Sequence, residues 1–136
     1  MTMNSEQLTM NSEQLTMNSE QLTMNKHNPA YEKAYALAIR IVNAYKLLSE
    51  QKHEFVLSKQ LLKSGTSIGA NLAEANGAIS EADLSAKVSV AYKETQETKY
   101  WLNLLKDTGY LDTKSFESIF FDVDEVAAIL LKMSSF

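Results

Sequence analysis

The spacing of apolar residues predicts four helices, and the most regular stretch, residues 58–75, reads SKQLLKSGTSIGANLAEA. Its apolar and small residues recur at alternating steps of four and three, which places them on one stripe of a helix: Leu61, Gly65, Ile68, Leu72 and Ala75. Small side chains at Thr66, Gly69 and Ala73 lie beside that stripe, so another backbone can approach closely. We therefore predict a helix over residues 56–76 that packs tightly against its neighbours.

An earlier helix is predicted to begin at Asn28 and Pro29, because Asn is a good N-cap and Pro is favoured at the first helical position. Two adjoining apolar stripes follow. The first holds Tyr31, Tyr35, Ala38, Val42 and Tyr45, and the second holds Leu37, Ile41, Ala44 and Leu48. Together they make a broader apolar face than a surface helix needs. The polar run 49–54 interrupts the pattern and predicts a loop.

The longest helix is predicted over residues 81–107, where Ser80 and Asp83 resemble a capping box. The four-three rhythm continues through Leu84, Val88, Ala91, Thr95, Thr98, Leu102 and Leu105. A flanking stripe of mixed character holds Val90, Glu94, Glu97, Trp101 and Leu104. Gly109 predicts the end of this helix.

The last helix is predicted to begin at Asp112 or Thr113, either of which can cap it, and to run to about Ser134. Its inner line is Phe116, Phe120, Val123, Ala127 and Leu130. Another side carries Phe121, Ala128 and Leu131, so this helix too is apolar on more than one side.

Four long helices with short links predict an all-α fold, an antiparallel up-down-up-down four-helix bundle. The first and last predicted helices offer more apolar surface than one bundle can hide. Large exposed apolar patches on proteins mark association surfaces, and closed symmetric homo-oligomers are their common outcome. We therefore expect the chain to bind copies of itself.

The bundle domain is predicted to cover residues 28–136, and residues 1–27 form a repeated tail. Residues 2–22 are three copies of TMNSEQL, and a fourth copy begins at Thr23. Leu8 and Met10 are two residues apart, whereas a coiled-coil seam needs steps of three and four. We expect a disordered or loosely helical tail, and translation that begins at Met24 is a hypothesis that mass spectrometry of the native protein tests.

Composition narrows the function classes. The chain has no cysteine, which excludes a disulfide framework and a thiolate metal site. No apolar run approaches the roughly 20 residues that span a bilayer, and no secretory signal pattern is present, so we expect a cytoplasmic protein without a membrane partner. The net charge is −4, whereas nucleic-acid binders usually carry a basic excess.

Two long motifs resemble a known family. They are SKQLLKSGTSIGANLAEA and, from Tyr92 to Leu111, YKETQETKYWLNLLKDTGYL. In this order and spacing they resemble the four-helix-bundle proteins encoded in intervening sequences of bacterial 23S ribosomal RNA genes, over about residues 29–131. The resemblance implies a ring, typically a homopentamer, and no established enzymatic activity or cofactor.

Related accessory proteins of diversity-generating retroelements form similar rings that engage a reverse transcriptase and nucleic acid through basic surfaces. By resemblance, those are the further partners to consider here. The present chain is acidic and has a single arginine, Arg40, which is unlike such a surface. The alternative function is therefore an RNA- or DNA-binding accessory factor that uses lysines on one rim of a ring, with Lys59 and Lys63, one helical turn apart, as the candidate phosphate contacts.

The best candidate site is a cluster of polar residues on the second and third predicted helices: Asn71, Glu74, Glu94, Glu97 and Thr98. We interpret it as structural, with Glu94 and Glu97 paired to Lys93, Lys59 or Lys63, and with Asn71 bonded to Ser67, Thr98 or another subunit. Such buried polar groups fix register or oligomer geometry when they are paired.

A metal enzyme built on Glu74, Glu94 and Glu97 is a third hypothesis. Bundle di-metal sites also use Glu-x-x-His pairs, whereas His27 and His53, the only histidines, lie outside the carboxylate helices. We therefore predict no metal, no cofactor and no catalytic residue. Tyr100 and Trp101 are interpreted as core or interface anchors, and Lys87, Lys99 and Lys106 as solvated.

Overall fold

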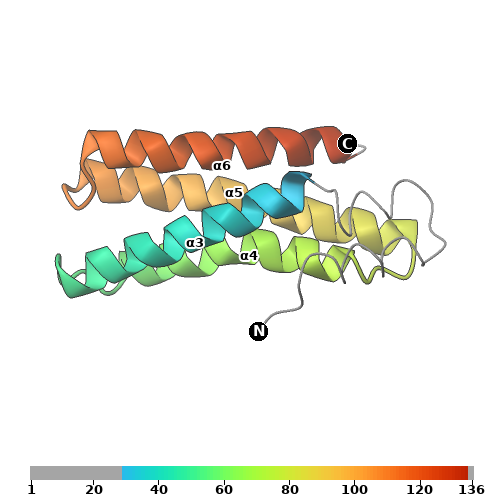
Figure 1. Ribbon diagram of the computed structural model, residues 1–136, viewed down its shortest axis with the longest axis horizontal. Coiled ribbons are helices and arrows are strands. Elements are labelled where there is room, and N and C mark those ends of the chain that lie inside the picture. Colours follow the sequence, from blue (N-terminus) through green and yellow to red (C-terminus); the bar gives the residue numbers. More distant parts are fainter. Residues whose placement is uncertain (1–28, 135–136) are drawn as a thin grey trace, which may run out of the picture.

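The computed structural model describes residues 29–134, which form four α-helices and no strand (Figure 1). Helix α3 spans Pro29–Glu50, α4 spans Leu57–Ala75, α5 spans Glu81–Asp107 and α6 spans Thr113–Met133. The all-α bundle predicted from the periodicity is confirmed. The repeated tail 1–27, the predicted N-cap Asn28 and the last two residues lie outside the described range.

Each helix packs against two others, so the four helices form a closed arrangement: α3 against α4, α4 against α5, α5 against α6, and α6 against α3. In the two seams described next, a residue that comes later in one helix contacts a residue that comes earlier in the other helix. Gly65 and Gly69 of α4 lie against Ile41 and Ala34 of α3, respectively. Lys99 and Lys106 of α5 likewise lie over the rings of Phe120 and Phe116 of α6.

Local side-chain bonds define the starts of α5 and α6, and a glycine turn follows the end of α5. The Ser80 hydroxyl accepts the N–H of Asp83 at 3.0 Å, and the Asp112 carboxylate accepts the N–H of Ser115 at 2.7 Å. These bonds satisfy N–H groups that have no partner within α5 and α6. After α5 the chain reverses at Gly109, whose φ of 89° is a conformation that residues with a side chain rarely adopt.

The core follows the predicted stripes closely. Every member of the predicted α4 stripe is buried, and in α5 only Leu84 is half-buried. The inner line of α6 is buried except for the half-buried Phe120. In α3 the stripe Leu37, Ile41, Ala44 and Leu48 enters the core, whereas the tyrosine-bearing stripe stays at its edge. The bundle thus hides one apolar stripe of α3 and leaves the second partly uncovered.

Candidate functional site

Glycine occupies the centre of the seam between α3 and α4 and leaves no room there for a side chain on α4. A Cβ atom placed on Gly65 would lie 2.8 Å from both Cγ1 and Cγ2 of Ile41, which is closer than carbon atoms pack. Gly69, one turn further on, leaves an ordinary 3.7 Å to Ala34. Gly65 therefore lets the Ile41 side chain rest directly on the α4 backbone, as the small-residue pattern predicted.

Polar contacts between α4 and α5 include one inside the core. The hydroxyl of Thr98 lies 3.1 Å from that of Ser64 and 2.7 Å from the carbonyl oxygen of Glu94, and both hydroxyl-bearing residues are buried. Asn71 does not reach α5 and instead donates to the carbonyl oxygen of Ser67, one turn earlier in α4, at 2.8 Å. Of the predicted polar cluster, Thr98 is thus the residue that bonds across this seam near its middle.

Glu94 and Glu97 lie together on the flank of α5 that faces α4. Burial raises the pKa of Glu94, the negative charge of Glu97 raises it further, and Lys63 of α4 opposes both effects. Glu97 accepts a 3.0 Å hydrogen bond from Nε1 of Trp101, whose ring is half-buried. Glu94 therefore lies in the field of one carboxylate, Glu97, and one lysine, Lys63.

Glu74 lies apart from this pair, near the end of α4. Its carboxylate forms a 2.8 Å ion pair with Lys87 at the start of α5, two turns before Glu94. Within residues 29–134, no three carboxylate or histidine side chains come close enough to hold a metal ion. Glu74 therefore does not lie with Glu94 and Glu97, and the three carboxylates considered for a metal site are not brought together.

One acidic residue that the sequence interpretation missed organises the start of α4. The buried Glu54 carboxylate accepts backbone N–H groups of Val56, Leu57 and Ser58 at 3.2, 2.9 and 2.6 Å. Burial alone raises the pKa of Glu54, but these bonds to its charged form outweigh burial and lower the pKa overall. His53, just before it, has a φ of 56° and turns the chain into this cap. The only sequence signal was an acidic residue shortly before a helix.

Helix α6 is bound to both neighbours by charged side chains. Arg40 of α3 pairs with Asp122 at 2.6 Å and also donates to the Ser118 hydroxyl at 2.8 Å. On the other flank, Lys99 of α5 pairs with Asp124 at 2.6 Å. Lys87, Lys99 and Lys106, predicted to be solvated, are about a fifth to a third exposed, and each also contacts a carboxylate or an aromatic ring. The periodic pattern missed these contacts because residues on the flank of a helix can be polar and still pack against a neighbouring helix.

The flank of α3 on the α4 side has a different character. We call it the α3 apolar line; it consists of Tyr31, Tyr35, Ala38, Ile39, Val42 and Tyr45. The rings of Tyr31 and Tyr35 lie 6.3 Å apart, Tyr35 is 59% exposed and Ile39 is 50% exposed. Within the described part of the chain no ion pair joins α3 to α4. This flank therefore presents side chains that water solvates poorly.

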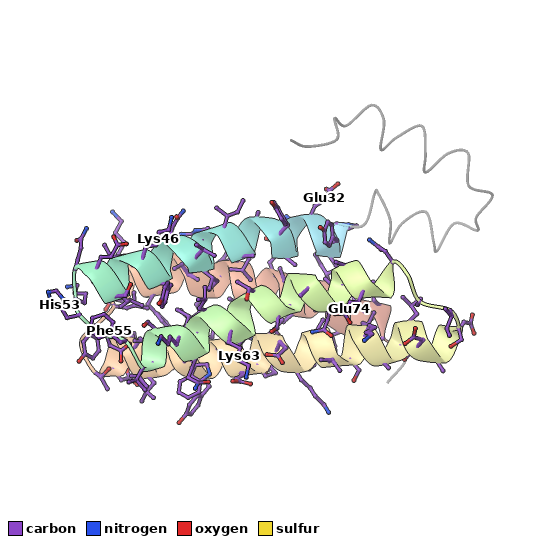
Figure 2. The ribbon with its side chains drawn as sticks, turned by 90° about the horizontal axis from the view of Figure 1, so that it is seen from below. Glu32, Lys46, His53, Phe55, Lys63 and Glu74 are labelled. Atoms are coloured by element: carbon purple, nitrogen blue, oxygen red, sulfur yellow. The ribbon has the colours of Figure 1, made fainter. Side chains whose placement is uncertain are left out.

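The assignment of this line to the α4 side follows from helix geometry. Arg40 and Lys33, which contact α6, each immediately precede a buried residue that contacts α4 or the core. Residues that immediately follow a buried position lie on the opposite flank, because successive side chains are about 100° apart. Every member of the α3 apolar line follows a buried residue except Ile39, which lies at the outer edge of that flank, one turn after Tyr35. Figure 2 shows α4 between α3 and α5 on one side of the bundle, with α6 behind.

The two lysines predicted to contact phosphate, Lys59 and Lys63, are both exposed on α4. Figure 2 places Lys63 beside the seam with α5, where its charge acts on Glu94. A lysine next to carboxylates attracts phosphate less than an isolated one does, so the geometry adds no support for a nucleic-acid interface. That role stays a prediction.

Comparisons with known proteins agree on one family. The sequence profile described as 23S rRNA-intervening sequence protein matches residues 26–132. A crystal structure from Bacteroides thetaiotaomicron VPI-5482, described as a protein with unknown function from the S23 ribosomal protein family, is similar to this chain with 47% identity and a TM-score of 0.77. The match covers 78% of this chain and 95% of that one. No curated protein matches. No helix in residues 29–134 is long and apolar enough to cross a membrane.

Proposed function

The chain belongs to the 23S rRNA-intervening sequence protein family, and from that premise we propose that it is a non-enzymatic helical scaffold that works by binding further copies of itself. The observation that carries this proposal is the α3 apolar line. Its exposed members stand together on one flank of one helix, whereas isolated exposed apolar residues are normal on any protein surface. A second copy that covers this line removes it from water.

The contrast between the two sides of the bundle supports the same proposal. The seams of α6 carry three of the ion pairs between helices, with Lys33, Arg40 and Lys99 as their cations. Charged side chains of this kind suit contact with water, although α6 also exposes Phe121 and Leu131, by 66% and 49%. The side formed by α3, α4 and α5 instead combines the α3 apolar line with small exposed residues on α4, among them Ala70 and Ala73. Small side chains allow a neighbouring helix to approach.

The assembly that we propose is a closed ring of antiparallel up-down-up-down bundles, a homopentamer by family resemblance, in the cytoplasm. The opposite sequence order of contacts along each seam supports the antiparallel topology. The bundle domain corresponds to residues 28–136, with the TMNSEQL repeats as a separate tail, and the family match beginning at residue 26 is consistent with that division.

Sedimentation velocity of the purified full chain at micromolar concentration tests this function. We expect the wild type to sediment as an oligomer, and Tyr35→Glu and Ile39→Glu to sediment as folded monomers with unchanged helical circular dichroism. Ala36→Glu is the matched control, because Ala36 is exposed on the same helix and lies one turn before Arg40, which contacts α6. A wild type that stays monomeric throughout the concentration range would exclude the proposed function.

A further inference from the structure

A single lysine, Lys46, extends the α3 apolar line toward the end of the helix. Tyr35, Ile39, Val42 and Lys46 follow one another at steps of four, three and four, so they share one side of α3. Lys46 is exposed, and no carboxylate among residues 29–134 lies within 4 Å of its ammonium group. Glu50, one turn further along α3, is the nearest acidic residue in sequence on that side. The line thus ends in a cation without an ion-pair partner among the described residues of its own chain.

The flank of α5 beside α4 has the complementary composition. Its residues repeat the same steps of four, three and four: Val90, Glu94, Glu97 and Trp101, which we call the α5 carboxylate line. Apolar side chains stand at both ends, with Val90 39% exposed, and two carboxylates stand in the middle. Tyr100, 58% exposed, packs edge-on against Trp101 at 4.8 Å between ring centroids.

The charge on this line is not neutralised by the groups around it. Lys63 is the one cation of α4 whose field acts on Glu94, and no side chain forms an ion pair with Glu94 or Glu97 within residues 29–134. Lys93 immediately precedes Glu94, so its side chain is rotated by about 100° around α5, away from the seam with α4. Burial and the charge of Glu97 already raise the pKa of Glu94, so a further cation placed here is favourable.

Lys46 and the carboxylates cannot meet within one chain. Lys46 lies on α3 and Glu94 and Glu97 on α5, with α4 between these helices, as Figure 2 shows for Lys46 and for Lys63 beside α5. A contact between these groups therefore joins two copies. Because the two lines are different surfaces, the contact is head-to-tail, which is the kind of interface that builds rings.

We infer that the α3 apolar line of one copy docks on the α5 carboxylate line of the next, with the Lys46 ammonium group bound between the carboxylates of Glu94 and Glu97. This inference rests on the proposed function and adds to it which surfaces meet and what sets their register. The apolar residues supply the contact area, and the charges select the partner surface and alignment, since complementary charge contributes specificity more than raw affinity.

A charge exchange tests the pairing by sedimentation velocity of the full chain. Lys46→Glu and Glu97→Lys each place like charges in the contact, and we expect each to weaken association at least about tenfold. The double variant Lys46→Glu/Glu97→Lys restores opposite charges and is expected to regain most of the wild-type association. A 1:1 mixture of the two single variants is expected to associate more strongly than either alone, because each supplies the surface that the other needs.

Lys132→Glu is the matched control, since Lys132 is exposed on α6 and forms no ion pair with any residue between 29 and 134. Circular dichroism verifies that every variant is folded. If the wild type assembles and Tyr35→Glu disrupts it, while Lys46→Glu and Glu97→Lys change the association constant less than twofold, the pairing is wrong and the proposed function stands. Failure of the double variant and of the mixture to recover association also overturns the pairing. A monomeric wild type refutes the proposed function itself.

Discussion

The backbone of Gly65 supports the side chain of Ile41, with no room for a β-carbon between α4 and α3. We expect Gly65→Ala to destabilise the bundle by about 1–3 kcal/mol, the range for overpacked cores, although alanine is the better helix former. Urea unfolding followed by circular dichroism measures the change.

Gly69→Ala provides the control for that substitution. The nearest neighbours of the added methyl group are 3.7 Å away, so only the helix propensity changes. We expect a stabilisation of about 0.5–1 kcal/mol. Equal effects of the two substitutions would show that the seam yields to a methyl group at Gly65.

The buried hydroxyl pair of Ser64 and Thr98 is expected to behave as a unit. Ser64→Ala or Thr98→Val removes one partner and leaves the other less well satisfied, at a cost of about 1 kcal/mol each. The double substitution makes the contact fully apolar, so its cost should be smaller than the sum of the two. A double-mutant cycle in urea measures the coupling, and strict additivity would contradict it.

The Glu54 cap predicts a pH-dependent stability. Glu54→Gln keeps the shape but loses the charge that three N–H groups bind, and we expect a loss of about 1–2 kcal/mol at pH 7. Because the pKa of Glu54 is lowered in the folded state, this contribution is fully present above the ordinary value of 4.5 and is lost as pH falls through the folded-state pKa.

Unfolding of wild type and Glu54→Gln between pH 7 and pH 2 should therefore show stability curves that converge in acid. Glu50→Gln serves as the control, since Glu50 is exposed on the last turn of α3. Curves for Glu54→Gln that remain parallel to those of the wild type would contradict the cap.

Glu94→Gln is expected to have opposite effects on the isolated bundle and on the assembly. The raised pKa means that the charged carboxylate disfavours folding of a single copy, so stability decreases as pH rises from 4.5 through the folded-state pKa. In the Tyr35→Glu background, Glu94→Gln should raise the unfolding midpoint at neutral pH. In the otherwise wild-type chain it should weaken association, because Lys46 of the neighbouring copy loses a partner. Parallel effects on folding and association would argue against the interface.

The contacts of Arg40 are expected to contribute modestly to the free energy of unfolding, and added salt should reduce that contribution. Its guanidinium group contacts the Asp122 carboxylate as well as the hydroxyl and carbonyl oxygen of Ser118, a forked arrangement that lysine cannot reproduce. Since the pair is partly exposed, we expect Arg40→Lys to cost about 0.5–1 kcal/mol at low salt and less at 1 M salt. Thermal unfolding at both salt concentrations measures this difference.

The sequence by itself determined the helices and their buried lines. Those lines depend on a period of 3.6 residues, which is local, so Leu61, Ile68, Leu102 and Leu105 could be assigned to the core without knowledge of any neighbour. The caps at Ser80 and Asp112 could also be identified from the sequence, because a capping side chain bonds to a backbone group only three residues away.

Only the tertiary structure decided what each helix flank meets. The sequence pattern of a polar residue beside a buried line is the same whether a neighbouring helix or water lies next to it. For this reason the sequence predicted a solvated Lys99 and grouped Glu74 with Glu94. The order of contacts between helices separated Glu74 from that group and gave Lys99 a carboxylate in α6. It also placed the α3 apolar line and the α5 carboxylate line on either side of α4, since helix neighbours are set by packing of the whole chain and not by local period.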